Sequence, residues 1–368
     1  MLSGKSGGYD GLPARLCWAA RLDGDEDGRR HVCTASNASE GSGTALEPLK
    51  LEPVERVRVT VLIDNYGDVF APSQGPATRK HLLSPTPNPV MNGGATLVPL
   101  VAEHGFSALV EVETGSTRRR LLFDTGVSPG GLAHNLSLLD INPLEIDAIV
   151  LSHGHFDHTG GFAGLVERYG SHNLPILVHP HAFRHRRLRS GNGVIDLPTP
   201  SRRYFEQSGF QVSEAENPSF LLDGSVLVTG EIERKTSFET GFAGQEAEIG
   251  NGWIPDPLVL DDQALVISVR NLGLVVITGC GHAGIINTCQ YARYLTGQSK
   301  IAAAAGGFHL SSVRDPIALA QVVEAFEDLD PGYLMPGHCT GLQATFAMME
   351  RFGSRVIPSL VGTTLTLG

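Results

Sequence analysis

A short run of histidine and aspartate residues carries the clearest chemical signal in the sequence. Four side chains of metal-ligand type fall within six residues, and they are His153, His155, Asp157 and His158. Imidazole nitrogen suits zinc, iron or nickel, and carboxylate adds a hard oxygen ligand. Burying such a cluster without a metal or hydrogen bonds would cost too much free energy. The cluster therefore predicts a transition-metal site, and the adjacency of Asp157 and His158 allows it to hold two ions.

Short apolar strands would position this cluster. Residues 148–151 are apolar and end just before the first histidine. The spacing of apolar residues predicts a helix over 316–329 and further strands near 57–63, 108–113, 119–123, 176–178, 226–228, 264–269, 274–277, 301–305 and 333–335. Strands and helices alternate after an early run of hairpins. This order favours an α/β sandwich of two mixed sheets flanked by helices.

The chain divides into a polar extension and one catalytic domain. Residues 1–50 are rich in Gly, Ser, Asp and Arg without a sustained period, so we expect them to be disordered. Residues 51–368 form the predicted catalytic domain. Two polar segments interrupt its pattern, near 70–98 and 184–222, and both are predicted to be loop insertions.

The composition argues against several classes of protein. The net charge of −11 disfavours a general nucleic-acid binder, which would carry a basic face. No apolar run approaches the ~18–20 residues of a membrane span, and the N-terminus lacks a secretory pattern. The five cysteines are odd in number and irregularly spaced, which favours a reducing compartment. We expect a cytoplasmic enzyme with a small-molecule substrate, and leave open whether it forms a homo-oligomer.

These motifs resemble those of a known family. His-x-His-x-Asp-His after an apolar strand resembles the signature of the metallo-β-lactamase superfamily, and Leu122–Gly126 is similar to its first motif. The resemblance covers roughly residues 55–345 and implies the metallo-β-lactamase-type αβ/βα sandwich. Finer segments resemble the 7,8-dihydropterin-6-methyl-4-(β-D-ribofuranosyl)aminobenzene-5′-phosphate synthase-like group, and these are Ile63–Asn65, Glu103–Ser107, Val228–Ile232, Thr278–Gly284, Gly306–Leu310 and Pro336–Gly341.

The resemblance also implies roles for single residues. Asp124 matches the aspartate that orients metal-binding histidines, and His338 matches the last metal-binding histidine. Cys280 stands where many members have a bridging aspartate, so it is either a thiolate ligand or a buried packing residue. His282 is predicted to be a ligand or a catalytic residue. The family's middle histidine has no obvious counterpart, so Glu231 is predicted to bind the metal or to support a ligand.

Four residues are predicted to bind the substrate. Asn65 and His104 lie in the segments shared with the synthase-like group. Arg186 and Arg187 belong to a basic island over residues 184–203, and arginine suits bidentate contact with phosphate. A solvated charged loop is the competing interpretation of that island.

A metal at the histidine cluster would make hydroxide available at neutral pH. Zinc is the expected metal, as one or two ions, with manganese, iron or magnesium as alternatives. Asp157 would serve as ligand and proton acceptor, with His282 as a further catalytic group. His309 follows an apolar strand and a Gly-Gly pair, which favours a catalytic place in the cleft over a structural role.

The predicted activity is metal-dependent hydrolysis of a small anionic or phosphorylated substrate. The resemblance implies a second activity, the condensation of a pterin diphosphate with an aryl-ribose phosphate. A non-catalytic metal- or ligand-binding protein of the same fold is the third alternative.

Overall fold

Two large β-sheets face each other in the computed structural model, which describes residues 33–34, 47–191, 193–313 and 315–368. The first sheet has eight strands in the order β12 (Gln211–Glu214), β9 (Pro175–Val178), β8 (Ala148–Val150), β7 (Thr117–Phe123), β6 (Ser107–Thr114), β2 (Arg56–Ile63), β21 (Thr363–Leu367) and β3 (Ala77–Arg79). The second has seven, in the order β1 (Cys33–Thr34), β13 (Ser219–Leu221), β14 (Val226–Val228), β17 (Ala264–Val269), β18 (Gly273–Thr278), β19 (Ile301–Gly307) and β20 (Tyr333–Gly337).

The core between the sheets follows from the alternation of apolar residues. Val57, Val59 and Val61 of β2 point into it, because side chains two apart share a face of a strand. Leu265 and Ile267 of β17 contribute to the same core from the opposite sheet. All five side chains are almost fully buried, which is worth roughly 1.5–3 kcal/mol for each large aliphatic group.

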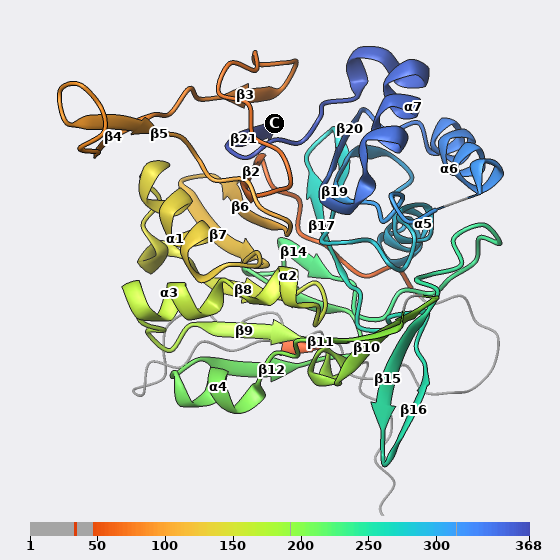
Figure 1. Cartoon of the computed structure of the whole chain (residues 1–368). Coiled ribbons are helices and arrows are strands. Elements are labelled where there is room, and N and C mark those ends of the chain that lie inside the picture. The colour runs from red at the N-terminus through yellow and green to blue at the C-terminus, as the bar shows by residue number, and fades with distance from the viewer. Residues whose placement is uncertain (1–32, 35–46, 192, 314) are drawn as a thin grey trace, which may run out of the picture.

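Helices cover the outer face of each sheet (Figure 1). The eight-stranded sheet packs against α1 (Pro129–Leu138), α3 (Phe162–Tyr169) and α4 (Arg202–Gln207). The seven-stranded sheet packs against α5 (Ile285–Thr296), α6 (Pro316–Leu329) and α7 (Leu342–Phe352). Short 3-10 helices span Pro143–Glu145, Pro180–Phe183, His338–Thr340 and Gly353–Arg355. The predicted α/β sandwich of two mixed sheets flanked by helices is confirmed.

The two segments predicted to be loop insertions contain strands. Residues 184–222 supply β10 (Arg186–Ser190) and β11 (Gly193–Leu197), which pair with β15 (Gln245–Ile249) and β16 (Gly252–Pro255) in a separate four-stranded sheet. Residues 70–98 supply β3 and a hairpin of β4 (Ser84–Pro87) and β5 (Ala95–Val98), which stands away from the body in Figure 1. Cross-strand pairing of polar side chains stabilises strands that a hydrophobic pattern does not reveal.

The predicted disorder of residues 1–50 lies mostly outside the described residues. The parts of that segment that are described contact the domain, since Cys33–Thr34 pairs with β13 and the Leu49 backbone donates to Leu295. None of the helices in the described part of the chain is long and apolar enough to cross a membrane.

Candidate metal centre

The signature histidines and aspartate lie where β8 ends. The backbone leaves the sheet after Val150, and His155 is the residue before α2 (Phe156–Thr159), which carries Asp157 and His158. Gly154 makes this path possible, because a Cβ at that position would lie 2.0 Å from the carbonyl oxygen of Ala182. The chain therefore turns sharply enough to bring neighbouring side chains to one region.

The other candidate ligands come from the seven-stranded sheet. Cys280 and His282 lie between the end of β18 and the start of α5, and His338 follows β20 directly. Strands β18, β19 and β20 run parallel, as do β7, β8 and β9, so their carboxyl ends carry the loops of the site. The site is thus built from loops of both sheets.

Three histidines form a first group. Nitrogen atoms of His153, His155 and His282 lie within 4.8 Å of one another. His153 Nε2 and His155 Nδ1 are 2.9 Å apart, and the His282 ring centroid lies 4.8 and 4.9 Å from theirs. Both ring nitrogens of His282 are buried without a hydrogen-bond partner among the described residues.

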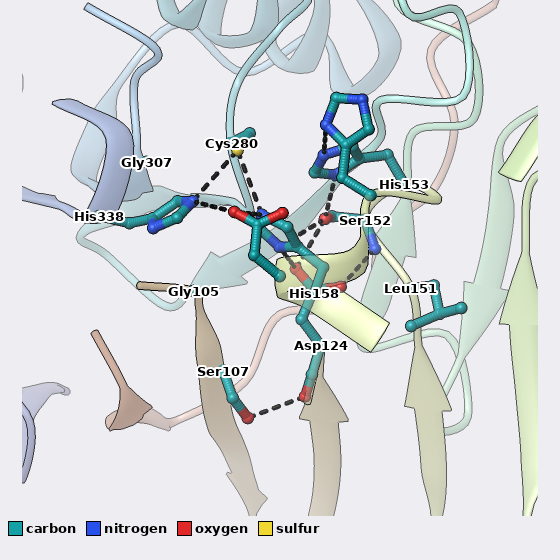
Figure 2. Close-up of polar contacts among 12 residues, drawn as sticks. Gly105, Ser107, Asp124, Leu151, Ser152, His153, His158, Cys280, Gly307 and His338 are labelled. Carbon is teal, nitrogen blue, oxygen red and sulfur yellow. Dashed lines mark hydrogen bonds and ion pairs between the residues drawn. The ribbon is translucent and has the colours of Figure 1, made fainter. Parts of the chain in front are cut away.

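A second group contains four side chains, which are Asp157, His158, Cys280 and His338. Figure 2 shows Cys280, His158 and His338 pointing toward one another. Cys280 Sγ lies 3.2 Å from His158 Nε2 and 3.3 Å from His338 Nε2. Asp157 Oδ2 lies 3.3 Å from His338 Nε2. A third grouping, of Cys280, His282 and His309, adjoins the other two.

Both groups fit a metal ion. Two nitrogen ligands at about 2.0–2.1 Å from a tetrahedral zinc are about 3.3 Å apart, close to the donor separations given above. Buried polar atoms without hydrogen-bond partners are rare and costly, so the ring of His282 also fits a role as a metal ligand. The mixture of imidazole, thiolate and carboxylate matches the donors that bind zinc and related transition metals.

Hydrogen bonds at the far ring nitrogens orient three of the histidines. His158 Nδ1 donates to Asp124 Oδ2 at 2.7 Å (Figure 2). His153 Nδ1 lies 2.8 Å from Ser152 Oγ, and that hydroxyl donates to Asp124 Oδ2 at 2.6 Å. His338 Nδ1 lies 3.1 Å from Asn65 Oδ1. Each of these contacts uses Nδ1 and leaves Nε2 directed toward the donor groups. Metal-binding histidines are commonly oriented by such a hydrogen bond at the other ring nitrogen.

Burial and neighbouring charges set the protonation of these groups. Burial lowers the pKa of His155 to about 4 and that of His153 and His282 well below the usual value, so these rings are neutral and have lone pairs available. Burial also opposes charge on His158, but Asp124 and Asp157 outweigh it and raise the pKa of His158 to about 9. Burial likewise opposes charge on Asp157, yet His158 and His338 hold its pKa far below its usual range.

The structure places Asp124, His104 and His309 beside the donor groups. Asp124 contacts His158 and Ser152 as described, and its carbonyl oxygen accepts from Ser107 Oγ at 2.8 Å. His104 Nε2 lies 3.4 Å from Asp157 Oδ2, and its side chain is 65% exposed. The His309 ring centroid lies 4.1 Å from that of His282.

One prediction about a polar residue needs correction, and a second stays a prediction. Glu231 is predicted to bind the metal or support a ligand, but its side chain is exposed and belongs to none of the three donor groups of the described residues. Asn65 is predicted to bind the substrate, and the structure shows its amide in contact with the loop of His338. Its Oδ1 faces the ring of His338 and accepts from Gly105 N, and its Nδ2 donates to the carbonyl oxygen of His338.

The two arginines assigned to phosphate binding also need correction. Arg186 is 2% exposed, and its guanidinium is paired with Asp256 and Asp261. Arg187 is paired with Glu246 and lies 4.0 Å over the ring of Trp253. Acidic residues distant in the sequence pair with both arginines, so neither side chain is free to hold a phosphate.

Several buried residues around the site carried no sequence signal of function. Ser152 adjoins the histidine motif, and Asp261 Oδ2 accepts from Gly154 N at 2.8 Å. Gln245 Oε1 lies 2.7 Å from His155 Nε2. Gln245 and Asp261 lie about ninety and more than a hundred residues from their partners in the chain, so no local motif connects them.

A four-layer sandwich with histidine-rich donor groups at the carboxyl ends of its strands defines a class of metal-dependent enzymes. Residues 101–296 match the family model described as the metallo-beta-lactamase superfamily, and the chain belongs to that superfamily.

Two curated relatives come from Methanocaldococcus jannaschii. The chain is 33% identical over 258 residues to the 7,8-dihydropterin-6-methyl-4-(beta-D-ribofuranosyl)-aminobenzene-5'-phosphate synthase of that organism. The aligned region covers 69% of this chain and 86% of the relative. It is 34% identical to an uncharacterized protein of the same organism, over 66% of this chain and 86% of that protein. The crystal structure of Tm1679, described as a metal-dependent hydrolase of the beta-lactamase superfamily, shares the fold with a TM-score of 0.60, 24% identity and coverage of 85% and 98%.

Proposed function

We propose that the protein is a metal-dependent hydrolase that acts on a small phosphorylated or otherwise anionic substrate. The observation that supports this proposal is that the donor side chains include a group of three histidines and a group of four mixed ligands. Three protein ligands leave a tetrahedral metal one open position for water or substrate, whereas four ligands fill it. The group of His153, His155 and His282 is therefore the proposed reacting site.

The group of four, Asp157, His158, Cys280 and His338, would hold a second ion. Zinc fits both groups best, since thiolate and imidazole are its common ligands, with manganese, iron or magnesium as alternatives. A metal bound at such a site would lower the pKa of a coordinated water, which makes hydroxide available, and would polarise a phosphoryl or carbonyl oxygen of the substrate.

The chain's own side chains would bind the substrate and move protons. His104 is exposed at the edge of the second group, where its ring is placed to donate to an anionic substrate oxygen. Both ring nitrogens of His309 are buried without a hydrogen-bond partner in the described part of the chain, so the ring would be available to hydrogen-bond the leaving group. The Phe242 ring centroid lies 4.9 Å from that of His309 and 5.6 Å from that of His282, so an apolar ring would cover this side of the reacting site.

A second candidate is a transferase of the pterin synthase type. The 33% identity to the methanogen synthase, over 86% of that protein, favours it. In this reaction an aryl-ribose phosphate would attack in place of water, and pyrophosphate would leave a dihydropterin diphosphate.

The metal-replete protein should be assayed with chromogenic phosphoesters and lactones, and with a dihydropterin diphosphate in the presence and absence of an aryl-ribose phosphate. We expect hydrolysis that disappears, together with bound metal, in the His153→Ala/His155→Ala double variant. Pyrophosphate release that requires the acceptor would favour the transferase instead. Hydrolysis that persists in the metal-free double variant would overturn the proposal.

A further inference from the structure

Gln245 is the one glutamine that touches a candidate metal ligand among the contacts of the described residues. It lies at the start of β15, in the four-stranded sheet outside the main sandwich, and is 1% exposed. Its Oε1 lies 2.7 Å from His155 Nε2. His155 Nδ1, on the other side of the ring, faces His153 Nε2 at 2.9 Å.

The amide of Gln245 has a defined orientation. Its Nε2 donates to the carbonyl oxygen of Asp256 at 3.3 Å and to Asp256 Oδ2 at 3.4 Å. Both of these atoms are acceptors, so the nitrogen must face Asp256 and the oxygen must face His155. An oxygen accepts only, and therefore the proton of the neutral His155 ring must sit on Nε2. Nδ1 then carries the lone pair toward the first donor group.

A buried ion-pair network holds Gln245 in this position. Arg186 Nε donates to Asp256 Oδ2 at 2.9 Å, and its Nη1 donates to Asp261 Oδ2 at 3.1 Å. The same Asp261 oxygen accepts from the backbone nitrogen of Gly154 at 2.8 Å, and Gly154 lies between His153 and His155 in the chain. Arg186 thus connects the glutamine to the backbone of the histidine motif.

From these contacts we infer that Gln245 is a positioning residue that selects the Nε2–H tautomer of His155 and so prepares Nδ1 to bind the first metal. This role rests on the proposed function, because it presumes that the three-histidine group binds a metal. It assigns the four-stranded sheet a part in building the metal centre. Removing a hydrogen-bond partner of a metal-binding histidine lowers metal affinity about 10–100-fold.

The test compares Gln245→Leu with Gln263→Leu. Gln263 is 2% exposed and donates to the carbonyl oxygen of Leu151, so it is an equally buried glutamine beside the same loop that does not touch a ring. Apoprotein would be titrated with Zn²⁺ and with Co²⁺, whose absorption spectrum reports the ligands. Nitrogen-15 NMR of labelled histidines in the apoprotein would report the tautomer of His155.

We expect Gln245→Leu to weaken one of two metal sites about 10–100-fold, to leave the other unchanged, and to lose the Nε2–H tautomer. Gln263→Leu should keep both the affinities and the tautomer. Unchanged affinities or an unchanged tautomer in Gln245→Leu would overturn the inference, and so would equal losses in the two variants. If the wild-type protein bound no metal, the proposed function would fail, while the tautomer measurement would still decide the role of Gln245.

Discussion

Single hydrogen bonds determine which ring nitrogen four of the histidines of the centre present to the donor groups. Asp124, Ser152 and Asn65 occupy the Nδ1 atoms of His158, His153 and His338, whereas Gln245 occupies the Nε2 atom of His155. His155 therefore faces its group through the opposite nitrogen from the other three. The difference follows from its position two residues after His153, since both rings must reach the same point from a turning backbone.

Arg186 is expected to stabilise the fold rather than bind substrate. Arg186→Met would leave Asp256 and Asp261 buried without a cation. This loss is costly because burial alone disfavours the charged form of Asp261, and Arg186 offsets that effect. Breaking a buried ion pair costs about 3–5 kcal/mol. Urea unfolding should show a loss of this size, against about 1 kcal/mol or less for Arg187→Met at the partly exposed pair with Glu246. Equal losses in the two variants would contradict this assignment.

The sequence predicts the residues of the centre better than their supporting contacts. His153, His155, Asp157 and His158 share a motif, and His282 and His338 follow apolar strands, so their types and positions are visible locally. Arg186 gives no such indication, because its acidic partners lie seventy and seventy-five residues away. Both partners follow β16, so the pairing of β10 with β15 and of β15 with β16 is needed to bring their segment near Arg186, and pairing between distant strands has no local pattern.

Among the elements, the predicted strands and the 316–329 helix all bury apolar side chains on a sandwich face. Strand β18 is an example, since its residues 274–277 are fully buried. By contrast, β10 has the sequence Arg-Arg-Leu-Arg-Ser, and its Arg187 lies opposite Glu246 of β15 and forms an ion pair with it. Hydrophobic periodicity detects the first kind of strand and misses the second.

The four-stranded sheet should weaken in acid. Hydrogen bonds from Arg189 and Arg187 lower the pKa of Glu246 from 4.5 to about 2. A depressed carboxyl pKa stabilises the folded state above pH 4.5, and this contribution is lost as the pH falls toward 2. The melting temperature of Glu246→Gln should therefore lie below that of the wild type at pH 7 and approach it near pH 2. Since the pair is near the surface, salt should reduce the difference. A difference that grew in acid would contradict the assignment.

In the molecule as a whole, the two halves of the sandwich meet at the donor groups. The eight-stranded sheet leads into His153, His155, Asp157 and His158, and the seven-stranded sheet leads into Cys280, His282 and His338. Each of the two groups contains members from both sheets. An ion in either group would therefore link the sheets, in addition to the apolar core between them.

Removal of metal should therefore lower the stability of the whole domain. An ion that binds only the folded chain contributes about 4 kcal/mol at a free concentration 1,000 times its dissociation constant. We expect a strong chelator to lower the melting temperature, and added Zn²⁺ to restore it. Hydrogen exchange should increase together in residues 151–158 and 279–284, because the two loops share ions although they belong to different sheets. Exchange that increased in only one of the loops would show that the ions do not link the two halves.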